Sequence, residues 1–339
     1  MSFIETEIFK LKNAFDLVLE KEAVETICPE EYLCKTIVTA ISPGTEMAAY
    51  AGVEPLRPGN IYPRVVGYCN IAEVIKIGEN ISDINIGDWL LTFQSHRSVF
   101  KQNIKDFKLI VSKNIKPEHA VTAYLFHLGL HAAQTGEVRA GHYVAIIGMG
   151  TLGFTTSLIC NLSNVNTTVF SNIPSSTFKK QDGINYFSKK DFQREELGIL
   201  TNNTGFDIII NTSNKWDDWK LALELCRKGG TIVNLGFPGR GEKLPDFNPL
   251  DPKYVYFKNI QIKPLGHISE SDVPPFEYRF NMKRNLEYIL YSIQKGKLSP
   301  DMIISEIVPY TELKEQYIKY LNKTQTIFTT ILDWRDNTL

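Results

Sequence analysis

One stretch decides the fold, because in it an apolar run meets three glycines spaced G-x-G-x-x-G: Tyr143-Val144-Ala145-Ile146-Ile147-Gly148-Met149-Gly150-Thr151-Leu152-Gly153. Gly148 permits a tight turn, Gly150 lets the backbone approach a pyrophosphate, and Gly153 lets the following helix pack closely on the strand. That helix, expected over residues 154–162, offers the unpaired N–H groups and positive dipole of its N-terminus to an anion. The pattern predicts a dinucleotide-binding turn that includes Thr151 and Leu152. The alternative is a tight turn without a ligand.

Alternating strand-like and helix-like segments surround this turn. Such alternation implies right-handed crossovers and a parallel sheet with helices on both faces. The sequence therefore predicts an α/β fold with a doubly wound sheet. The expected strands are residues 143–147, 167–170, 206–211, 231–235 and 259–264, and the expected helices are residues 154–162 and 216–227.

The N-terminal part carries β-strand signals instead. Its short apolar runs, at 32–41, 71–77 and 89–93, are separated by Gly, Pro, Asn and Asp. Further helices are expected at 118–135 and 278–295. We therefore expect a β-rich domain at 1–120, a nucleotide-binding domain at 121–264 and a C-terminal return to the first domain at 265–339.

The composition excludes several classes of protein. The chain has 339 residues and a formal net charge of −1, and no charge block marks a nucleic-acid or membrane surface. Its five cysteines are scattered without a C-x-x-C, which argues against a disulfide framework and fits a reducing compartment. No signal peptide is read at the N-terminus, and no apolar stretch approaches the ~18 residues of a membrane span. We expect a cytoplasmic protein that acts on a small molecule.

The end of the second strand of the expected sheet bears on the choice of cofactor. In NAD-binding units an acidic residue about 20 residues beyond the glycines accepts hydrogen bonds from the ribose 2′-hydroxyl. Here that place holds Ser171 and Asn172, and Lys179 and Lys180 follow. With no carboxylate to repel a 2′-phosphate and two lysines in reach, the sequence favours NADP(H) over NAD(H). The alternative is that the lysines belong to a solvated helix face.

Other cofactor contacts are expected at the carboxyl ends of the later strands, where ligands of parallel sheets bind. The candidates are Thr212, Gly236, Phe237, Leu265 and Gly266.

Segments at both ends of the chain carry a resemblance to a known family. They are Gly67-Tyr68-Cys69-Asn70-Ile71-Ala72-Glu73-Val74-Ile75-Lys76-Ile77-Gly78 with Gly87-Asp88, and Val308-Pro309-Tyr310-Thr311-Glu312-Leu313 with Leu332-Asp333-Trp334. On these residues the chain resembles the medium-chain dehydrogenase/reductase superfamily over nearly its whole length. The resemblance implies a GroES-like catalytic domain, a Rossmann domain and a cleft between them. It also implies a homodimer formed through the edge of the Rossmann sheet, and a nicotinamide amide held by the last two loops, at Gly236-Phe237 and Leu265-Gly266.

The chain departs from the zinc-dependent members of that family at each metal ligand. Their cysteine ligand falls on Pro43, their histidine on Tyr68 and their third ligand near Tyr124. The four-cysteine zinc lobe is also missing, because no cysteine lies between Cys69 and Cys160. Catalytic zinc needs three protein ligands and an open position. We therefore expect no zinc and no other metal.

Two further observations concern this expectation. His127 and His131 share a face of an expected helix, but they supply only two of the three protein ligands that catalytic zinc needs. Residues 42–46 and 66–70 are similar to the bacteriochlorophyllide dehydrogenase-like bi-domain oxidoreductases, a zinc-free group. Quinone oxidoreductases and enoyl reductases are the other zinc-free relatives.

Without a metal, hydroxyl, imidazole and backbone N–H groups must stabilise charge on the substrate oxygen or move its proton. Thr45 aligns with the Ser/Thr that relays the alcohol proton in zinc-dependent relatives. Tyr68 and Tyr124 replace zinc ligands and are expected to face the cleft, where a phenol can donate to a carbonyl oxygen. We rank Tyr68 first as a catalytic residue, followed by Thr45, Tyr124 and His96. The alternative is that the two tyrosines only fill the volume left by the metal.

The sequence thus favours a zinc-independent, NADP(H)-dependent oxidoreductase that acts on a carbonyl, an activated alkene or the matching alcohol. One alternative is an NAD-dependent secondary alcohol dehydrogenase of a biosynthetic pathway. Another is a nucleotide-binding redox sensor without turnover. The glycines predict cofactor binding in both cases, so they do not distinguish an enzyme from a sensor.

Overall fold

The computed structural model describes residues 4–56, 59–270, 280–323 and 326–337. The chain divides into two compact units, each with its own sheet and core. The first unit is Met1–Tyr124 with Leu286–Leu339, and the second is Leu125–Asn285. The changes of unit fall within helices α3 (Ala123–Thr135) and α8 (Met282–Gln294).

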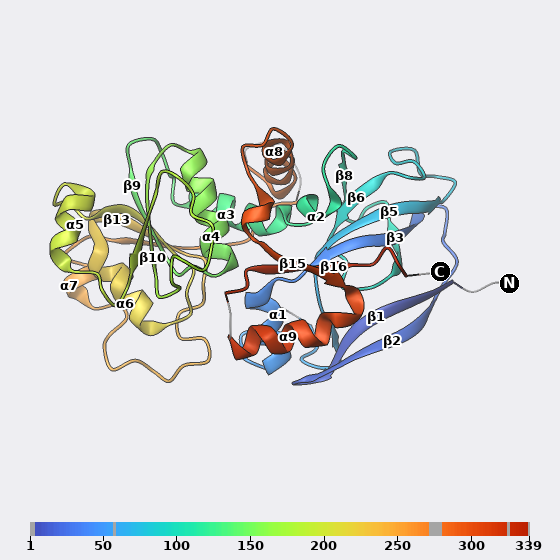
Figure 1. Ribbon diagram of the computed structural model, residues 1–339, viewed down its shortest axis with the longest axis horizontal. Coiled ribbons are helices and arrows are strands. Elements are labelled where there is room, and N and C mark those ends of the chain that lie inside the picture. The colour runs from blue at the N-terminus through green and yellow to red at the C-terminus, as the bar shows by residue number, and fades with distance from the viewer. Residues whose placement is uncertain (1–3, 57–58, 271–279, 324–325, 338–339) are drawn as a thin grey trace. The chain divides into compact units, whose positions relative to one another are not determined.

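The second unit is built on a parallel sheet with the strand order β11-β10-β9-β12-β13-β14. Helix α4 packs against β9 and β10, and α6 packs against β12 and β13 from the opposite face (Figure 1). The order reverses between β9 and β12, as in a doubly wound nucleotide-binding sheet. The strands are β9 (Tyr143–Ile147), β10 (Asn166–Ser171), β11 (Ile184–Ser188), β12 (Phe206–Asn211), β13 (Cys226–Asn234) and β14 (Gln261–Pro264); the helices are α4 (Thr151–Leu162), α5 (Arg194–Thr201), α6 (Trp216–Leu225) and α7 (Pro252–Val255).

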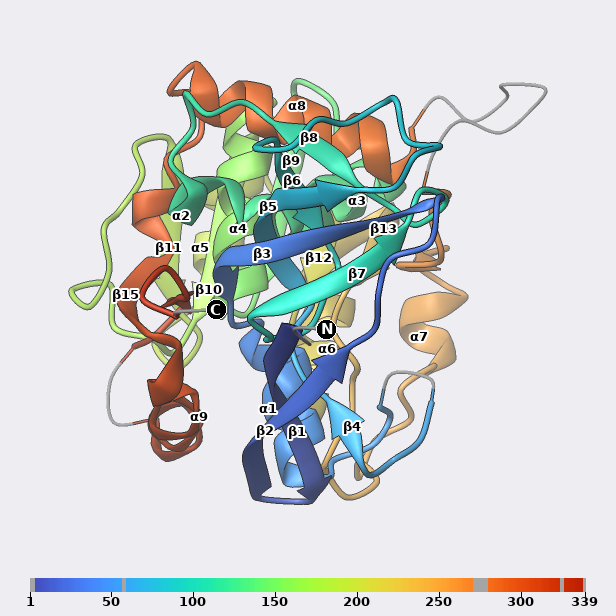
Figure 2. The ribbon, with the colours of Figure 1, turned by 90° about the vertical axis from the view of Figure 1, so that its right-hand side faces the viewer.

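The first unit holds a larger mixed sheet and a smaller one. The larger sheet runs β15-β16-β3-β5-β6-β8, with β7 also paired to β3, and the smaller runs β2-β1-β4. Figure 2 shows the β1–β2 hairpin beside α1 and below the larger sheet. The strands are β1 (Ile4–Asn13), β2 (Asp16–Val24), β3 (Glu31–Ala40), β4 (Arg64–Val65), β5 (Cys69–Ile77), β6 (Trp89–Thr92), β7 (Val99–Asn103), β8 (Leu109–Val111), β15 (Ile304–Pro309) and β16 (Thr329–Asp333); the helices are α1 (Pro43–Ala51), α2 (Pro117–Ala120) and α9 (Leu313–Asn322), with short 3₁₀ turns at Pro300–Met302 and Tyr310–Glu312.

The C-terminal segment completes the core of the first unit. Strand β16 pairs with β3, and the fully buried Trp334 meets Phe9 edge to face at 6.1 Å between ring centroids. Tyr317 of α9 meets Tyr50 of α1 in the same way at 5.2 Å. This packing fixes α1, the helix that carries Thr45.

The sequence-based helix at 118–135 is two helices in the structure. Helix α2 ends at Ala120, and α3 begins at Ala123. Thr122 N–H donates to the carbonyl of His119, which closes a tight turn between them. The helix expected at 278–295 is α8; residues 278 and 279 lie outside the described part of the chain.

The boundaries between units also differ from those expected, 120/121 and 264/265. The described residues 265–270 and 280–285 belong to the second unit, and hydrogen bonds connect them to it. Leu265 N–H donates to the carbonyl of Asn234, and the amides of Asn285 and Gln134 pair reciprocally at 2.9 Å. The return to the first unit therefore begins at Leu286.

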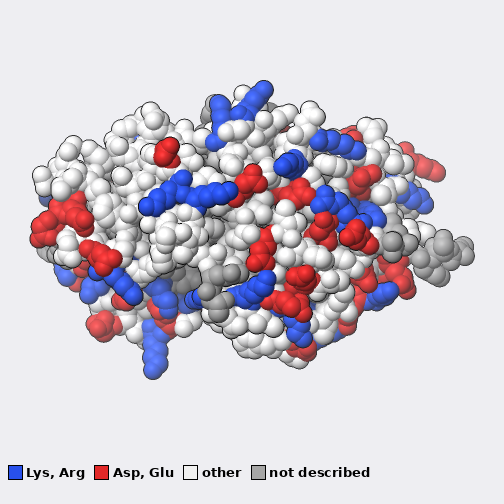
Figure 3. All heavy atoms as spheres, viewed as in Figure 1, with Lys and Arg blue, Asp and Glu red and all other residues white. Residues whose placement is uncertain are grey.

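The distribution of charge on the surface and the character of the helices can be compared with what the composition predicts. Acidic and basic side chains are interspersed over the face shown in Figure 3. Among the described residues, no helix combines the length and the apolar character that crossing a bilayer requires.

Candidate functional site

The glycine turn lies at the carboxyl end of β9 and has the form a pyrophosphate requires. Gly148 adopts a φ of 96°, a left-handed conformation that favours glycine. A Cβ on Gly153 would lie 2.1 Å from the Gly148 carbonyl oxygen, so α4 approaches the turn as closely as possible. A Cβ on Gly150 would meet no atom within 4 Å, and Gly150 caps α4 without a side chain. The space beside Gly150 is therefore open at the N-terminus of α4, which starts with Thr151 and Leu152, and helix N-termini of this kind can bind an anion.

The predicted residues after β12, β13 and β14 lie at the carboxyl end of the parallel sheet. Thr212 Oγ1 donates to the carbonyl of Ile147 at 3.0 Å, which joins the end of β12 to the glycine turn. Gly236 N–H donates to the Asn211 carbonyl, and Leu265 N–H to the Asn234 carbonyl. Each strand end is thus bonded to its neighbour. The structure brings together, at the carboxyl ends of these strands, Thr212, Gly236, Phe237, Leu265 and Gly266.

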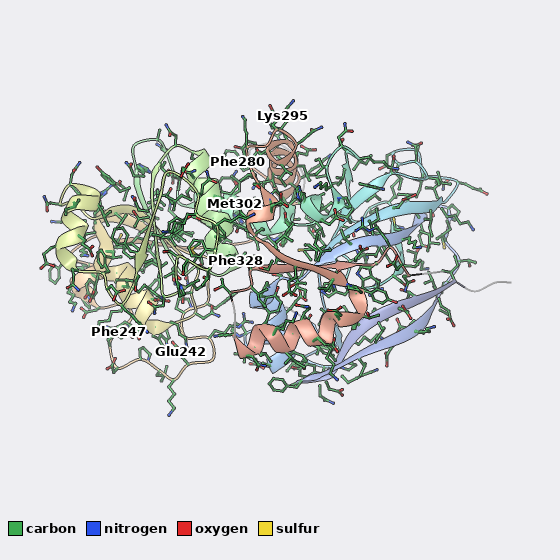
Figure 4. All side chains as sticks on the ribbon, in the orientation of Figure 1. Glu242, Phe247, Phe280, Lys295, Met302 and Phe328 are labelled. Atoms are coloured by element: carbon green, nitrogen blue, oxygen red, sulfur yellow. The ribbon has the colours of Figure 1, made fainter. Side chains whose placement is uncertain are left out.

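The loop after β13 is fastened to the start of α6. Glu242 accepts from Trp216 N–H at 2.7 Å and from Lys215 Nζ at 2.6 Å, and Phe247 meets the Trp216 ring edge to face. Figure 4 shows Glu242 and Phe247 on this loop. These contacts give the Phe237 region a defined course, and half-exposed Phe237 itself donates its N–H to Asn214 Oδ1 at 2.8 Å.

The end of β10 carries no carboxylate at the position expected for the ribose. Ser171 is buried and its Oγ accepts from Ile173 N–H at 3.0 Å, whereas Asn172 and Lys179 are exposed. The Phe178 ring packs on Phe154 of α4 at 5.6 Å and so anchors the segment that bears Lys179.

An acidic residue that the sequence did not suggest belongs to the same part of the unit. Lys189 N–H donates to the carbonyl of Ser171, and its Nζ binds both carboxylate oxygens of Asp218 at 2.6 and 2.8 Å. The lysine neutralises this buried carboxylate.

In the first unit, hydroxyl groups gather around Tyr68. Tyr68 is buried, and its hydroxyl donates to Ser42 Oγ at the start of α1. The same hydroxyl lies 3.4 Å from Thr45 Oγ1. The Tyr124 ring meets the Tyr68 ring edge to face at 5.5 Å. The structure thus brings together three predicted catalytic residues: Tyr68, Thr45 and Tyr124.

His96, the fourth candidate, does not join them. Its side chain is 0% exposed, with Nε2 2.9 Å from Glu46 Oε2 and Nδ1 2.8 Å from Thr39 Oγ1. Both ring nitrogens are engaged inside the core. We therefore correct the prediction: His96 supports α1 from below and is not open to a substrate.

Sequence reasoning missed the residues that hold Tyr68 in place. Glu46 is 2% exposed, and its carboxylate accepts from Ser42 N–H at 2.6 Å and from the Tyr317 hydroxyl at 2.5 Å. Burial and the Glu46 carboxylate hold the pKa of Tyr317 well above its usual value, so its hydroxyl remains a donor. One signal was readable: Ser42-Pro43 has the form of an N-cap followed by proline at the first helical position.

The residues at the three aligned zinc-ligand positions do not fit that metal. Pro43 has no donor side chain, and Tyr68 and Tyr124 offer phenols instead of the usual nitrogen, sulfur or carboxylate ligands. In the part of the chain that the structure describes, no cluster of three or more His, Cys, Asp or Glu could hold a metal ion. The rings of His127 and His131 stack at 6.0 Å. Independence from zinc stays a prediction.

Comparison with known proteins gives one family and one fold. A family model described as zinc-binding dehydrogenase matches residues 152–277, which lie in the second unit and do not include positions 43, 68 and 124. Similar curated proteins include the sorbitol dehydrogenase of Bacillus subtilis (22% identical over 74% of this chain and 79% of that protein). The L-threonine 3-dehydrogenase of Pyrococcus furiosus is 25% identical over 88% of this chain and 90% of its own.

Solved structures share the fold over almost the entire chain. Galactitol-1-phosphate dehydrogenase from Escherichia coli has a TM-score of 0.79 at 13% identity and covers 96% of this chain and 99% of its own. A putative zinc-binding dehydrogenase from Sinorhizobium meliloti, bound to NADP, has a TM-score of 0.77 at 16% identity and covers 98% and 100%. These matches agree with a β-rich unit joined to a Rossmann unit.

Proposed function

The chain belongs to the medium-chain dehydrogenase/reductase superfamily and is an enzyme of that class, and from this premise we propose a zinc-independent hydride transfer. The substrate is a carbonyl compound, an activated alkene or the matching alcohol, and the cofactor is NADP(H). Bound nicotinamide supplies or takes the hydride. The protein must then hold the substrate oxygen and move its proton.

One observation carries the proposal: the Tyr68 hydroxyl stands among other hydroxyls where zinc-dependent relatives place a metal ligand. Its partners Ser42 Oγ and Thr45 Oγ1 come from the first turn of α1. In carbonyl reduction Tyr68 rotates its O–H toward the substrate oxygen and gives up its proton, while Thr45 offers a second donor. General acid catalysis of this kind contributes typically 10²–10⁴-fold.

The preference for NADP(H) is proposed from charge. Ser171 and Asn172 present no carboxylate after β10, and exposed Lys179 follows them. A 2′-phosphate is a dianion that a lysine attracts and a carboxylate would repel.

Fluorescence titration with NADPH and NADH tests this choice. Lys179→Ala is expected to weaken NADPH binding several-fold and to leave NADH binding unchanged. Lys314→Ala, an exposed lysine of α9, is the matched control. Tighter binding of NADH than of NADPH by the unmodified protein would refute the proposal.

The reaction class is tested by following NADPH oxidation with menadione, cyclohexenone, benzaldehyde and butanone, and the reduction of NADP⁺ and of NAD⁺ with sec-butanol. Turnover of at least one carbonyl or enone supports the proposal. Turnover of the alcohol with NAD⁺ alone, with none of the others active, would favour the secondary alcohol dehydrogenase.

We further propose a cytoplasmic homodimer. Strand β14 is an edge of the parallel sheet, and its unpaired backbone groups can meet those of a second copy across a two-fold axis. A monomer at every concentration in sedimentation equilibrium would contradict the dimer.

A further inference from the structure

Ser42 occupies a helix N-cap but does not act as one. N-cap serines usually accept a hydrogen bond from the second or third N–H of the helix through their side chain. Ser42 precedes α1 without any such bond. Its Oγ instead accepts from the Tyr68 hydroxyl, and the residue is 4% exposed. The hydroxyl is thus committed to Tyr68 at the expense of the helix.

The backbone of Ser42 is fixed by a buried carboxylate. Glu46 Oε1 accepts from Ser42 N–H at 2.6 Å. Glu46 Oε2 accepts from the Tyr317 hydroxyl at 2.5 Å and lies 2.9 Å from His96 Nε2. A buried carboxylate with three donors is held in one geometry, because losing any of them would leave charge unpaired in the core.

His96 is held in turn. Its Nδ1 lies 2.8 Å from Thr39 Oγ1, which accepts from Trp334 Nε1 at 3.0 Å. If the Thr39 hydroxyl donates to Nδ1, then Nε2 carries the proton and donates to Glu46. Gly67 makes room for the ring, since a Cβ there would lie 2.6 Å from it. Gly67 directly precedes Tyr68, so the histidine supports both sides of the contact.

We propose that Ser42 is a positioning residue for Tyr68, held in register by Glu46; this rests on the proposed function, in which Tyr68 meets the substrate oxygen. In reduction, hydride from the reduced nicotinamide forms the C–H bond. The Tyr68 O–H bond breaks, and the proton forms the O–H bond of the product. Ser42 then reverses its hydrogen bond and donates Oγ–H to the phenolate, which water reprotonates.

Kinetics over a range of pH test the role of Ser42, with NADPH and the fastest-reduced member of the panel above. Ser42→Ala is expected to lower kcat about tenfold, with KM within about twofold, because a phenolate without this donor is less stable. For the same reason the alkaline limb of the plot of kcat against pH should move to higher pH. Ser98→Ala removes a buried serine of the same unit that accepts from Glu7 N–H, and should leave kcat and the pH profile unchanged.

Tyr68→Phe separates failure of this inference from failure of the proposed function. Tyr68→Phe should lower kcat at least as much as Ser42→Ala, and adding Ser42→Ala to it should cost no more, since the two act as a unit. Loss of activity in Tyr68→Phe with wild-type kinetics in Ser42→Ala would overturn the positioning role alone. Wild-type kinetics in Tyr68→Phe would overturn both. A fall in kcat for Ser98→Ala equal to that for Ser42→Ala would also overturn the positioning role.

Discussion

Two glycines of one motif have opposite structural duties. Gly150 has an ordinary φ of −74° and open space where its side chain would be. Gly153 has the Gly148 carbonyl oxygen 2.1 Å from the place of its Cβ. We propose that the open space beside Gly150 receives the ligand, whereas Gly153 allows α4 to pack closely against β9.

Alanine at each position should therefore give different failures. Gly150→Ala is expected to fold with an unchanged melting temperature but to bind NADPH at least about tenfold more weakly, because its methyl occupies the approach of the pyrophosphate. Gly153→Ala should lower the melting temperature. Thermal unfolding and fluorescence titration measure both. Wild-type NADPH affinity in Gly150→Ala would contradict the assignment of the turn.

Buried His127 makes stability depend on pH. Burial, with a smaller effect of His131, lowers its pKa from 6.5 to about 3. Below pH 6.5 the His127 imidazole is therefore protonated in the unfolded chain but stays neutral in the folded chain. The free energy of unfolding falls as the pH drops toward 3.

Urea unfolding at pH 7 and pH 5 measures this effect. His127 should account for about 2 kcal/mol of the wild-type loss between pH 7 and pH 5. His127→Leu should reduce that loss by the same amount. His131 has a pKa lowered chiefly by burial and adds a loss of the same sign that remains in the variant. Equal losses in both proteins would show that His127 titrates normally.

At the scale of an element, the end of α6 depends on one lysine. Lys258 Nζ donates to the carbonyls of Leu223, Glu224 and Cys226 at 2.8–2.9 Å. These carbonyls lie at the C-terminus of α6, where carbonyl groups have no hydrogen-bond partner within the helix. A cation there also interacts favourably with the negative end of the helix dipole.

Removing that charge should loosen the junction of α6 and β13. Lys258→Met keeps the length of the side chain and is expected to cost about 2 kcal/mol of unfolding free energy. Lys243→Met, at an exposed loop position, is the control and should change stability by less than about 0.5 kcal/mol. Similar values for the two variants in urea unfolding would contradict this role.

At the scale of the whole molecule, the sequence was most informative where local signals suffice. Strands β9 and β12 begin and end as expected, because turn residues next to their apolar, β-branched runs mark the strand ends in the sequence itself. The hairpin β1–β2 and helix α1 were not predicted. Alternation in β1 is interrupted at Ile8-Phe9, and β2 contains the charged run Glu20-Lys21-Glu22, in which Glu20 and Glu22 pair with Lys10 of β1.

The candidate site was predictable only in part for a related reason. Resemblance placed Tyr68, Thr45 and Tyr124 together, and their ring and hydroxyl contacts agree with that. The support from Glu46, by contrast, joins residues 50 and 271 positions away in the chain, His96 and Tyr317. No local pattern indicates such a contact, so His96 was taken for a group open to substrate.

Hydride transfer without zinc can be measured in the presence and in the absence of the metal. That measurement is the kcat for NADPH oxidation with the best carbonyl substrate, before and after stripping the protein with a chelator and again after adding Zn²⁺. We expect rates within about twofold in all three states, since no proposed step depends on a metal Lewis acid. Loss of activity on stripping and recovery with Zn²⁺ would contradict it, and would mean that ligands other than Pro43, Tyr68 and Tyr124 hold the metal.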